Sequence, residues 1–81
     1  MEKFHTTDLG VASYLVYLDY EPELKQLSIG RIDFVFMLPE EKSDEIISGY
    51  WGGHNLVHPR KFYNAVKSVK NYIYQRKIDN Y

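Results

Sequence analysis

The sequence contains no cysteine and no long hydrophobic run. Without cysteine it can form neither a disulfide framework nor a thiolate metal site, and this composition fits a reducing compartment. The longest nearly uncharged stretch, residues 9–18, is far too short to cross a bilayer, and residues 1–5 lack the apolar run of a signal peptide. We therefore expect a cytoplasmic protein that has no membrane partner.

Neither sign of charge dominates, because 10 Lys and Arg residues balance 11 Asp and Glu residues. Overall electrostatics therefore do not draw the protein towards nucleic acid or anionic lipid. The charges are nevertheless unevenly placed, since residues 1–59 carry a net −6 and residues 60–81 a net +5. Such a split indicates a polar partner for one end or two halves that complement each other, and a self-complementary homodimer would also explain it.

The chain does have apolar and aromatic residues, which make up 44% and 16% of it and exceed the content of a disordered chain. Its 81 residues leave room for a single domain, residues 1–81, with one small core. Residues 9–18 are apolar on nearly all sides of a helical wheel, which predicts a buried, central helix. Apolar alternation predicts strands at 24–29 and 32–38, paired as a hairpin, and a short edge strand around Phe4.

Proline and glycine mark the two remaining elements. One helix is predicted to begin at Pro39 and to stop at Gly52-Gly53, and the last helix to run from Pro59 to about Lys77. The buried face of the last helix is predicted to comprise Phe62, Ala65, Val66, Val69, Tyr72 and Ile73. The order β-α-β-β-α-α predicts an α+β fold, with a sheet of about three antiparallel strands against which the last helix packs.

Three short motifs along the chain resemble those of one protein family. They are residues 4–9 with Ala12 and Tyr14-Leu15 after them, residues 32–36, and residues 57–63 with Ala65 and Val69-Lys70 after them. This order resembles an uncharacterised family of short phage and mobile-element proteins, known only as a numbered domain of unknown function. The resemblance covers nearly the whole chain and implies a virus, prophage or plasmid setting in a host cytoplasm, but no activity and no site residue. Where that family more often has an acidic residue, this chain has His58, which is a weaker helix cap.

No set of residues in the sequence indicates catalysis or metal binding. Of the three histidines, His5 stands alone, and His54 and His58 are four apart but lie in a predicted loop rather than on a helix. We expect His58 to cap the last helix and His54 to be a loop residue. The paired carboxylates within residues 40–45 fall in the first turns of a predicted helix, where the helix dipole favours them. The sequence therefore predicts no catalytic residue, no metal and no cofactor.

The strongest functional pattern lies on the last helix. Spacings of 3, 4, 3, 4 and 3 place one set of side chains on a single face: Arg60, Tyr63, Lys67, Lys70, Tyr74 and Lys77. These cations and rings could track a phosphate backbone and stack bases, or could dock on an acidic protein groove. They could equally form a solvated face whose tyrosine rings lie along the edge of the core. The only tryptophan, Trp51, sits at the rim of a turn, where it either closes the core or anchors a partner.

Protein binding fits the mixed charge best, because six surplus negative charges elsewhere in the chain would repel a long polyanion. We therefore predict a non-enzymatic module that binds a host or element-encoded protein and modulates it as an inhibitor or adaptor. The residues expected to bind are Trp51, Arg60, Tyr63, Lys67, Lys70, Tyr74 and Lys77, with the acidic helix start at 40–45 as a second surface. Single-stranded nucleic-acid binding through the same helix face is the alternative, and an enzyme is the third class.

Overall fold

The computed structural model describes residues 3–28, 31–53 and 55–79, and only the backbone of residues 76–79. Its elements in chain order are β1 (Lys3–Thr6), α1 (Leu9–Tyr17), β2 (Glu23–Ser28), β3 (Arg31–Met37), α2 (Glu40–Gly52) and α3 (Pro59–Asp79). The three strands form one antiparallel sheet, so the α+β class and the element order predicted above are confirmed. Residues 29 and 30, which connect the two strands of the predicted hairpin, lie outside the described residues.

The sheet has the order β1-β3-β2, which places the most apolar strand between the other two. Phe36 of β3 lies opposite Phe4 of β1, and Phe34 lies opposite Leu24 of β2. Because β1 and β2 are both antiparallel to β3, they run parallel to each other, and α1 makes the crossover between them. The short strand predicted around Phe4 is therefore an edge strand, as expected.

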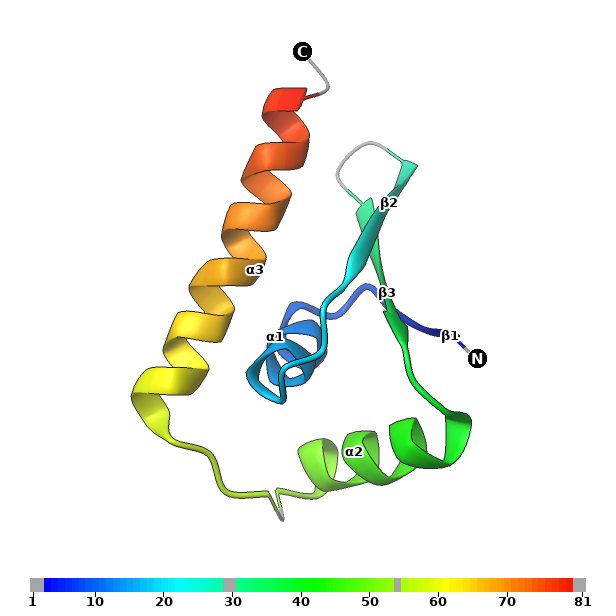
Figure 1. Cartoon of the computed structure of the whole chain (residues 1–81), viewed down its shortest axis with the longest axis vertical. Coiled ribbons are helices and arrows are strands. Elements are labelled where there is room, and N and C mark those ends of the chain that lie inside the picture. Colours follow the sequence, from blue (N-terminus) through cyan, green and yellow to red (C-terminus); the bar gives the residue numbers. More distant parts are fainter. Residues whose placement is uncertain (1–2, 29–30, 54, 80–81) are drawn as a thin grey trace.

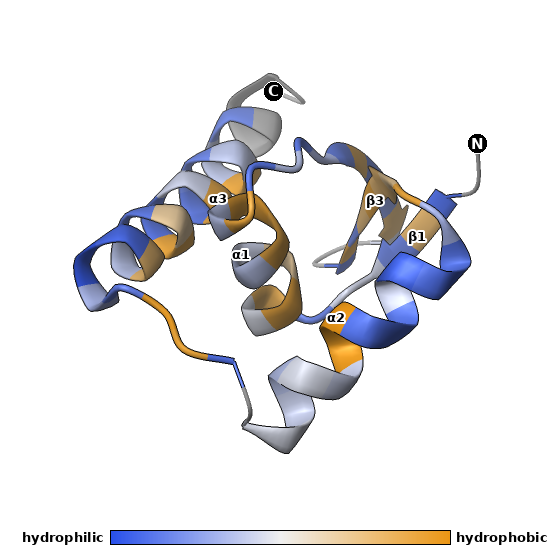
Figure 2. Cartoon of the chain, turned by 60° about the horizontal axis from the view of Figure 1, so that its bottom comes forward, coloured by the Kyte–Doolittle hydropathy of each residue, from blue (hydrophilic) through white to orange (hydrophobic). Residues whose placement is uncertain are grey.

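Helix α1 is the central element of the molecule and lies between the sheet and α3 (Figures 1 and 2). Five consecutive residues of α1, from Val11 to Leu15, are buried, which confirms the prediction of a helix covered on all sides. The prediction that the last helix packs on the sheet is wrong, since α3 packs along α1 instead. The reason is that α1 is apolar on opposite faces, so the sheet covers one face and a second helix must cover the other.

Side chains and backbone geometry define where each helix begins and ends. The carboxylate of Asp8 accepts a hydrogen bond from the Val11 amide at 2.9 Å and caps α1. Gly53 ends α2 in the left-handed conformation at φ 70°, at the predicted Gly-Gly stop. The Lys61 amide donates to Nδ1 of His58 at 3.3 Å, so His58 caps α3 as predicted. The His58 amide also donates to the Tyr17 hydroxyl at 2.9 Å, which ties the start of α3 to the end of α1.

The core lies where α1 meets β3 on one side and α3 on the other. Its largest fully buried side chains are those of Leu15, Phe34, Phe36, Leu38 and Val69. Val35 is also fully buried, but it points to the opposite face of β3. On α3, Ala65 and Val69 are buried as predicted, but Tyr72 is 40% exposed and does not belong to the buried face. Helix α1 is about 13 Å long and α3 about 31 Å, and α3 packs against the core as far along as Ile73.

Candidate functional site

The outer face of α3 presents the residues that the sequence singled out. We call Arg60, Tyr63, Lys67, Lys70 and Tyr74 the basic-aromatic stripe; Lys77 follows them on the helix, but its side chain lies outside the described residues. All five side chains are exposed, and the stripe extends over about 21 Å of helix. Tyr63 and Tyr74 are 63% and 62% exposed, so their rings do not lie along the edge of the core.

The positive charges of the stripe are not neutralised within the described part of the chain. Arg60, Lys67 and Lys70 form no ion pair with a described carboxylate. The Lys67 amine lies 5.6 Å from the centroid of the Tyr63 ring, a cation–π contact that keeps charge and ring together on the surface. The acidic first turn of α2 lies on the other side of α1 from α3 (Figure 1), so the two charged surfaces face different directions.

Apolar side chains gather where α2 ends and the connection to α3 begins. Trp51 is 65% exposed and packs edge-on against the Tyr50 ring, with centroids 5.0 Å apart, so it does not close the core. In the connection, Leu56 is 95% exposed and Val57 is 37% exposed. The sequence analysis did not select Leu56, although an apolar pair in a short loop between two helices was the available signal. His54, predicted to be a loop residue, lies outside the described residues.

A histidine–carboxylate pair lies on the sheet face that points away from α1. His5 of β1 and Asp33 of β3 meet with 2.7 Å between Nδ1 and Oδ2, and their side chains are 49% and 12% exposed. A carboxylate only accepts hydrogen bonds, so Nδ1 of His5 donates to it. Sequence analysis missed this pair, although a charged residue in the middle of the most apolar strand was a signal that it needs a partner.

The His5–Asp33 pair stabilises the sheet rather than marking a metal site. Within the described ranges, no group of three or more His, Asp or Glu side chains is placed to hold a metal ion. His5 joins edge strand β1 to central strand β3 through side chains 28 positions apart in the sequence. The pair thus supplements the backbone ladder where β1 is only four residues long.

Replacing His5 with valine is expected to lower the free energy of unfolding by about 1–3 kcal/mol, because Asp33 then keeps a mostly buried carboxylate without its partner. The double replacement His5→Val with Asp33→Val is expected to cost less than His5→Val alone, since valines in adjacent strands pack well. Urea denaturation of both single variants and the double variant measures this. Strictly additive losses would contradict a direct interaction between the two side chains.

Comparison with known proteins gives no relative for this chain. No protein family matches it, and no match was found among curated proteins or among solved structures. No helix within the described ranges is both long enough and apolar enough to cross a membrane.

Proposed function

We propose that this chain is a non-enzymatic interaction module that binds an acidic surface of another protein through the basic-aromatic stripe of α3. The observation that carries the proposal is the exposure of Tyr63 and Tyr74, above 60% each, beside cations that no described carboxylate neutralises. Tyr and Arg are the residue types that most often dominate the energy of protein interfaces. A face that were merely solvated would have no need of two large rings held in water.

The exposed apolar residues near the start of α3 favour a protein over a nucleic acid as the partner. Trp51 and Leu56 offer apolar anchors for a protein surface, and an aliphatic side chain such as Leu56 has no ring on which a base could stack. The overall charge of −1 also fits a protein partner better than a long polyanion. The resemblance to phage and mobile-element proteins adds the setting: in a host cytoplasm, the module would inhibit or recruit a host or element-encoded protein.

Single-stranded nucleic acid is the second candidate partner. Exposed rings of Tyr63 and Tyr74 alternate with cations along about 21 Å of helix, which is the arrangement that stacks bases while it follows a backbone. Such binding would weaken steeply as salt increases, because each phosphate contact releases counterions. A protein complex anchored by rings and apolar side chains depends less on salt.

Photo-crosslinking tests the proposal and separates the two partners. With p-benzoylphenylalanine in place of Tyr63 or Tyr74, irradiation of cells that express the chain is expected to give adducts that a protease removes and a nuclease does not. The same group in place of Met37, which is 47% exposed on the sheet, serves as the control position and is expected to give none of these adducts. Nuclease-sensitive adducts would replace the proposal by the second candidate, and identical adducts from positions 37 and 63 would refute the stripe as the site.

Reversing the charge of the stripe should remove these adducts without unfolding the protein. Lys67→Glu with Lys70→Glu is expected to weaken binding by tenfold or more, the order of one lost charge-assisted contact, and to change stability by less than about 1 kcal/mol because both side chains are exposed. The matched control is Lys3→Glu with Arg31→Glu, which makes the same change in net charge on exposed sheet residues. Equal loss of binding in both double variants would show a dependence on net charge rather than on the stripe.

A further inference from the structure

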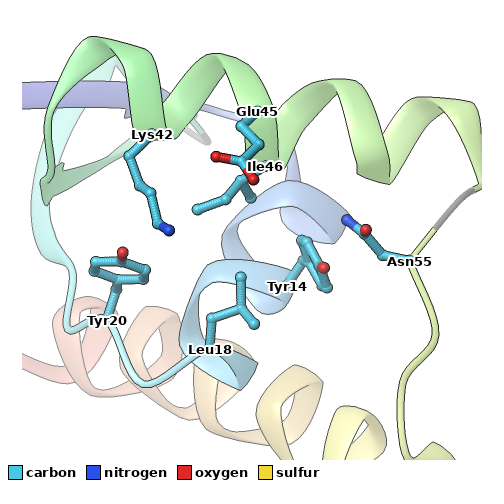
Figure 3. Close-up of a pocket in the computed structure, with 7 residues that line it drawn as sticks. All are labelled: Tyr14, Leu18, Tyr20, Lys42, Glu45, Ile46 and Asn55. Atoms are coloured by element: carbon cyan, nitrogen blue, oxygen red, sulfur yellow. The ribbon is translucent and has the colours of Figure 1, made fainter.

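A hollow of ≈ 360 Å³ lies between α1, α2 and the start of the α2–α3 connection, away from the stripe. Its apolar lining consists of Leu18, at the end of α1, and Ile46, on α2 (Figure 3). Figure 3 shows Lys42 and Tyr20 at one end of the hollow and Tyr14 and Asn55 at the other. The volume is in the range of small-molecule sites, which combine an apolar lining with a few placed polar groups.

Tyr14 is a buried residue whose hydroxyl has no hydrogen-bond partner among the described residues. The residue is only 6% exposed, and its phenol forms no hydrogen bond with any described residue. Its ring is held in place by the Tyr17 ring, stacked at 6.2 Å, and by the Tyr50 ring at 5.7 Å. Buried tyrosine hydroxyls are almost always paired. A fixed, unpaired hydroxyl at the wall of a hollow therefore indicates a place for a polar atom of a ligand.

Asn55 lies beside Tyr14 at the same end of the hollow. Both residues also line a second hollow of ≈ 210 Å³, which continues towards α3. The Asn55 amide lies against the backbone of α2 at Gly49, where any β-carbon would overlap it. Like the Tyr14 hydroxyl, this amide forms no hydrogen bond with a described residue. The end of the hollow at Tyr14 and Asn55 thus offers a hydroxyl and an amide, groups that both donate and accept.

The other end of the hollow carries one charge of each sign. Lys42 and Glu45 lie one turn apart on α2 and line the hollow, but they form no ion pair with each other. The Tyr20 hydroxyl faces Lys42 across the mouth (Figure 3). A ligand with only a negative charge would meet Glu45, and one with only a positive charge would meet Lys42. A ligand that carries an ammonium group and a carboxylate on one carbon satisfies both residues.

We infer that this hollow binds a free α-amino acid whose side chain is aromatic and ends in a polar group. The carboxylate of the ligand would pair with Lys42 and accept from the Tyr20 hydroxyl, and its ammonium group would pair with Glu45. The ring would lie between Leu18 and Ile46, and the polar tip would reach the Tyr14 hydroxyl and Asn55. This site is separate from the stripe on α3, so a test of amino-acid binding does not depend on whether the stripe binds the proposed protein partner.

L-Tyrosine and three analogues that each lack one recognised group test the inference. Phenylalanine lacks the polar tip, tyrosinamide lacks the carboxylate, and N-acetyltyrosine lacks the ammonium group. In ¹⁵N-resolved NMR titrations of the full chain, L-tyrosine is expected to give saturable shifts at residues lining the hollow. Each charge-deleted analogue is expected to bind about tenfold more weakly or worse, the order of one lost charge-assisted hydrogen bond.

Four variants assign each group of the ligand to its residues. Lys42→Met should strongly reduce the discrimination between tyrosine and tyrosinamide, leaving only what the Tyr20 hydroxyl contributes. Glu45→Gln should abolish the discrimination between tyrosine and N-acetyltyrosine. Tyr14→Phe should reduce the discrimination between tyrosine and phenylalanine, and Tyr14→Phe with Asn55→Ala should abolish it. Lys67→Met, on the exposed face of α3, should leave all three ratios unchanged. Because each result is a ratio measured on one folded variant, a loss of stability does not imitate it.

The alternative occupants give different outcomes. A hollow that holds only water would give no saturable shift with L-tyrosine at its solubility limit, and this would overturn the inference. Equal affinities for tyrosine and its three analogues would show that the hollow does not recognise the two charges of an amino acid, and this would overturn the inference. A neutral heteroaromatic site would bind adenosine in place of tyrosine, and that result would also overturn the inference.

Discussion

Val69→Asp is expected to lower the free energy of unfolding by several kcal/mol and to abolish the cooperative unfolding transition at moderate urea. Val69 is 0% exposed and belongs to the core between α1 and α3. A carboxylate there has no described partner, and an unpaired buried charge costs about 3–5 kcal/mol. A domain of this size has about 4–12 kcal/mol of total stability, so this single change removes a large part of it.

The control for this prediction is Asn71→Asp, which adds the same charge to the exposed side of the same helix. It is expected to change stability by less than about 0.5 kcal/mol, as exposed substitutions usually do. Circular dichroism at 222 nm, followed through a urea titration, measures both variants. If Val69→Asp were as stable as Asn71→Asp, α3 would not pack on α1 through Val69. The face of α3 that carries the stripe would then be wrongly assigned as its outer face.

Substitutions on the two faces of α3 should therefore have different effects on stability and on binding. Charge reversal at Lys67 and Lys70 alters only the exposed stripe and should remove binding from a folded protein. Val69→Asp should remove both, since the stripe has a defined shape only while the helix is held on α1. A protein that still bound its partner after Val69→Asp would place the binding residues somewhere other than α3.

The sequence was sufficient to predict the elements because each has a strong local signal. Residues 9–18 are apolar on nearly all sides, and this pattern requires that other elements cover the helix from more than one direction. Alternation in residues 32–38 predicted the central strand in the same way. The stripe was predictable too, since spacings of three and four place residues on one helix face whatever the helix packs against.

The layer order could not be predicted from these signals. Periodicity shows which face of the last helix is buried but not which element covers it, so packing on the sheet and packing on α1 give the same pattern. The 40% exposure of Tyr72, which lies between buried Val69 and partly buried Ile73, also follows only from the packing. The same reasoning applies to the stripe: its periodicity was visible in the sequence, whereas the exposure of Tyr63 and Tyr74, above 60% each, was not.

Sites formed by residues that are distant in the sequence could not be predicted for a related reason. His5 meets Asp33 only because β1 pairs with β3 in a register that sets His5 opposite Val35. The hollow beside Tyr14 combines α1, α2 and two connections, and no local motif links Lys42 to Tyr20. In both cases the chemistry depends on tertiary placement, and a shift of one residue in strand register would remove His5 from Asp33.

Phe36→Ala is expected to be the most destabilising truncation in the sheet. Phe36 is 0% exposed in the central strand and lies opposite Phe4, and truncation of a buried phenylalanine typically costs about 3–5 kcal/mol. Met37→Ala, one residue further along the same strand, is the matched control because Met37 points to the other face and is 47% exposed. It is expected to cost less than about 1 kcal/mol, since exposed substitutions change stability little. Comparable losses of unfolding free energy in urea titrations of both variants would mean that the Met37 side chain is also buried, and that this end of β3 is covered on both faces.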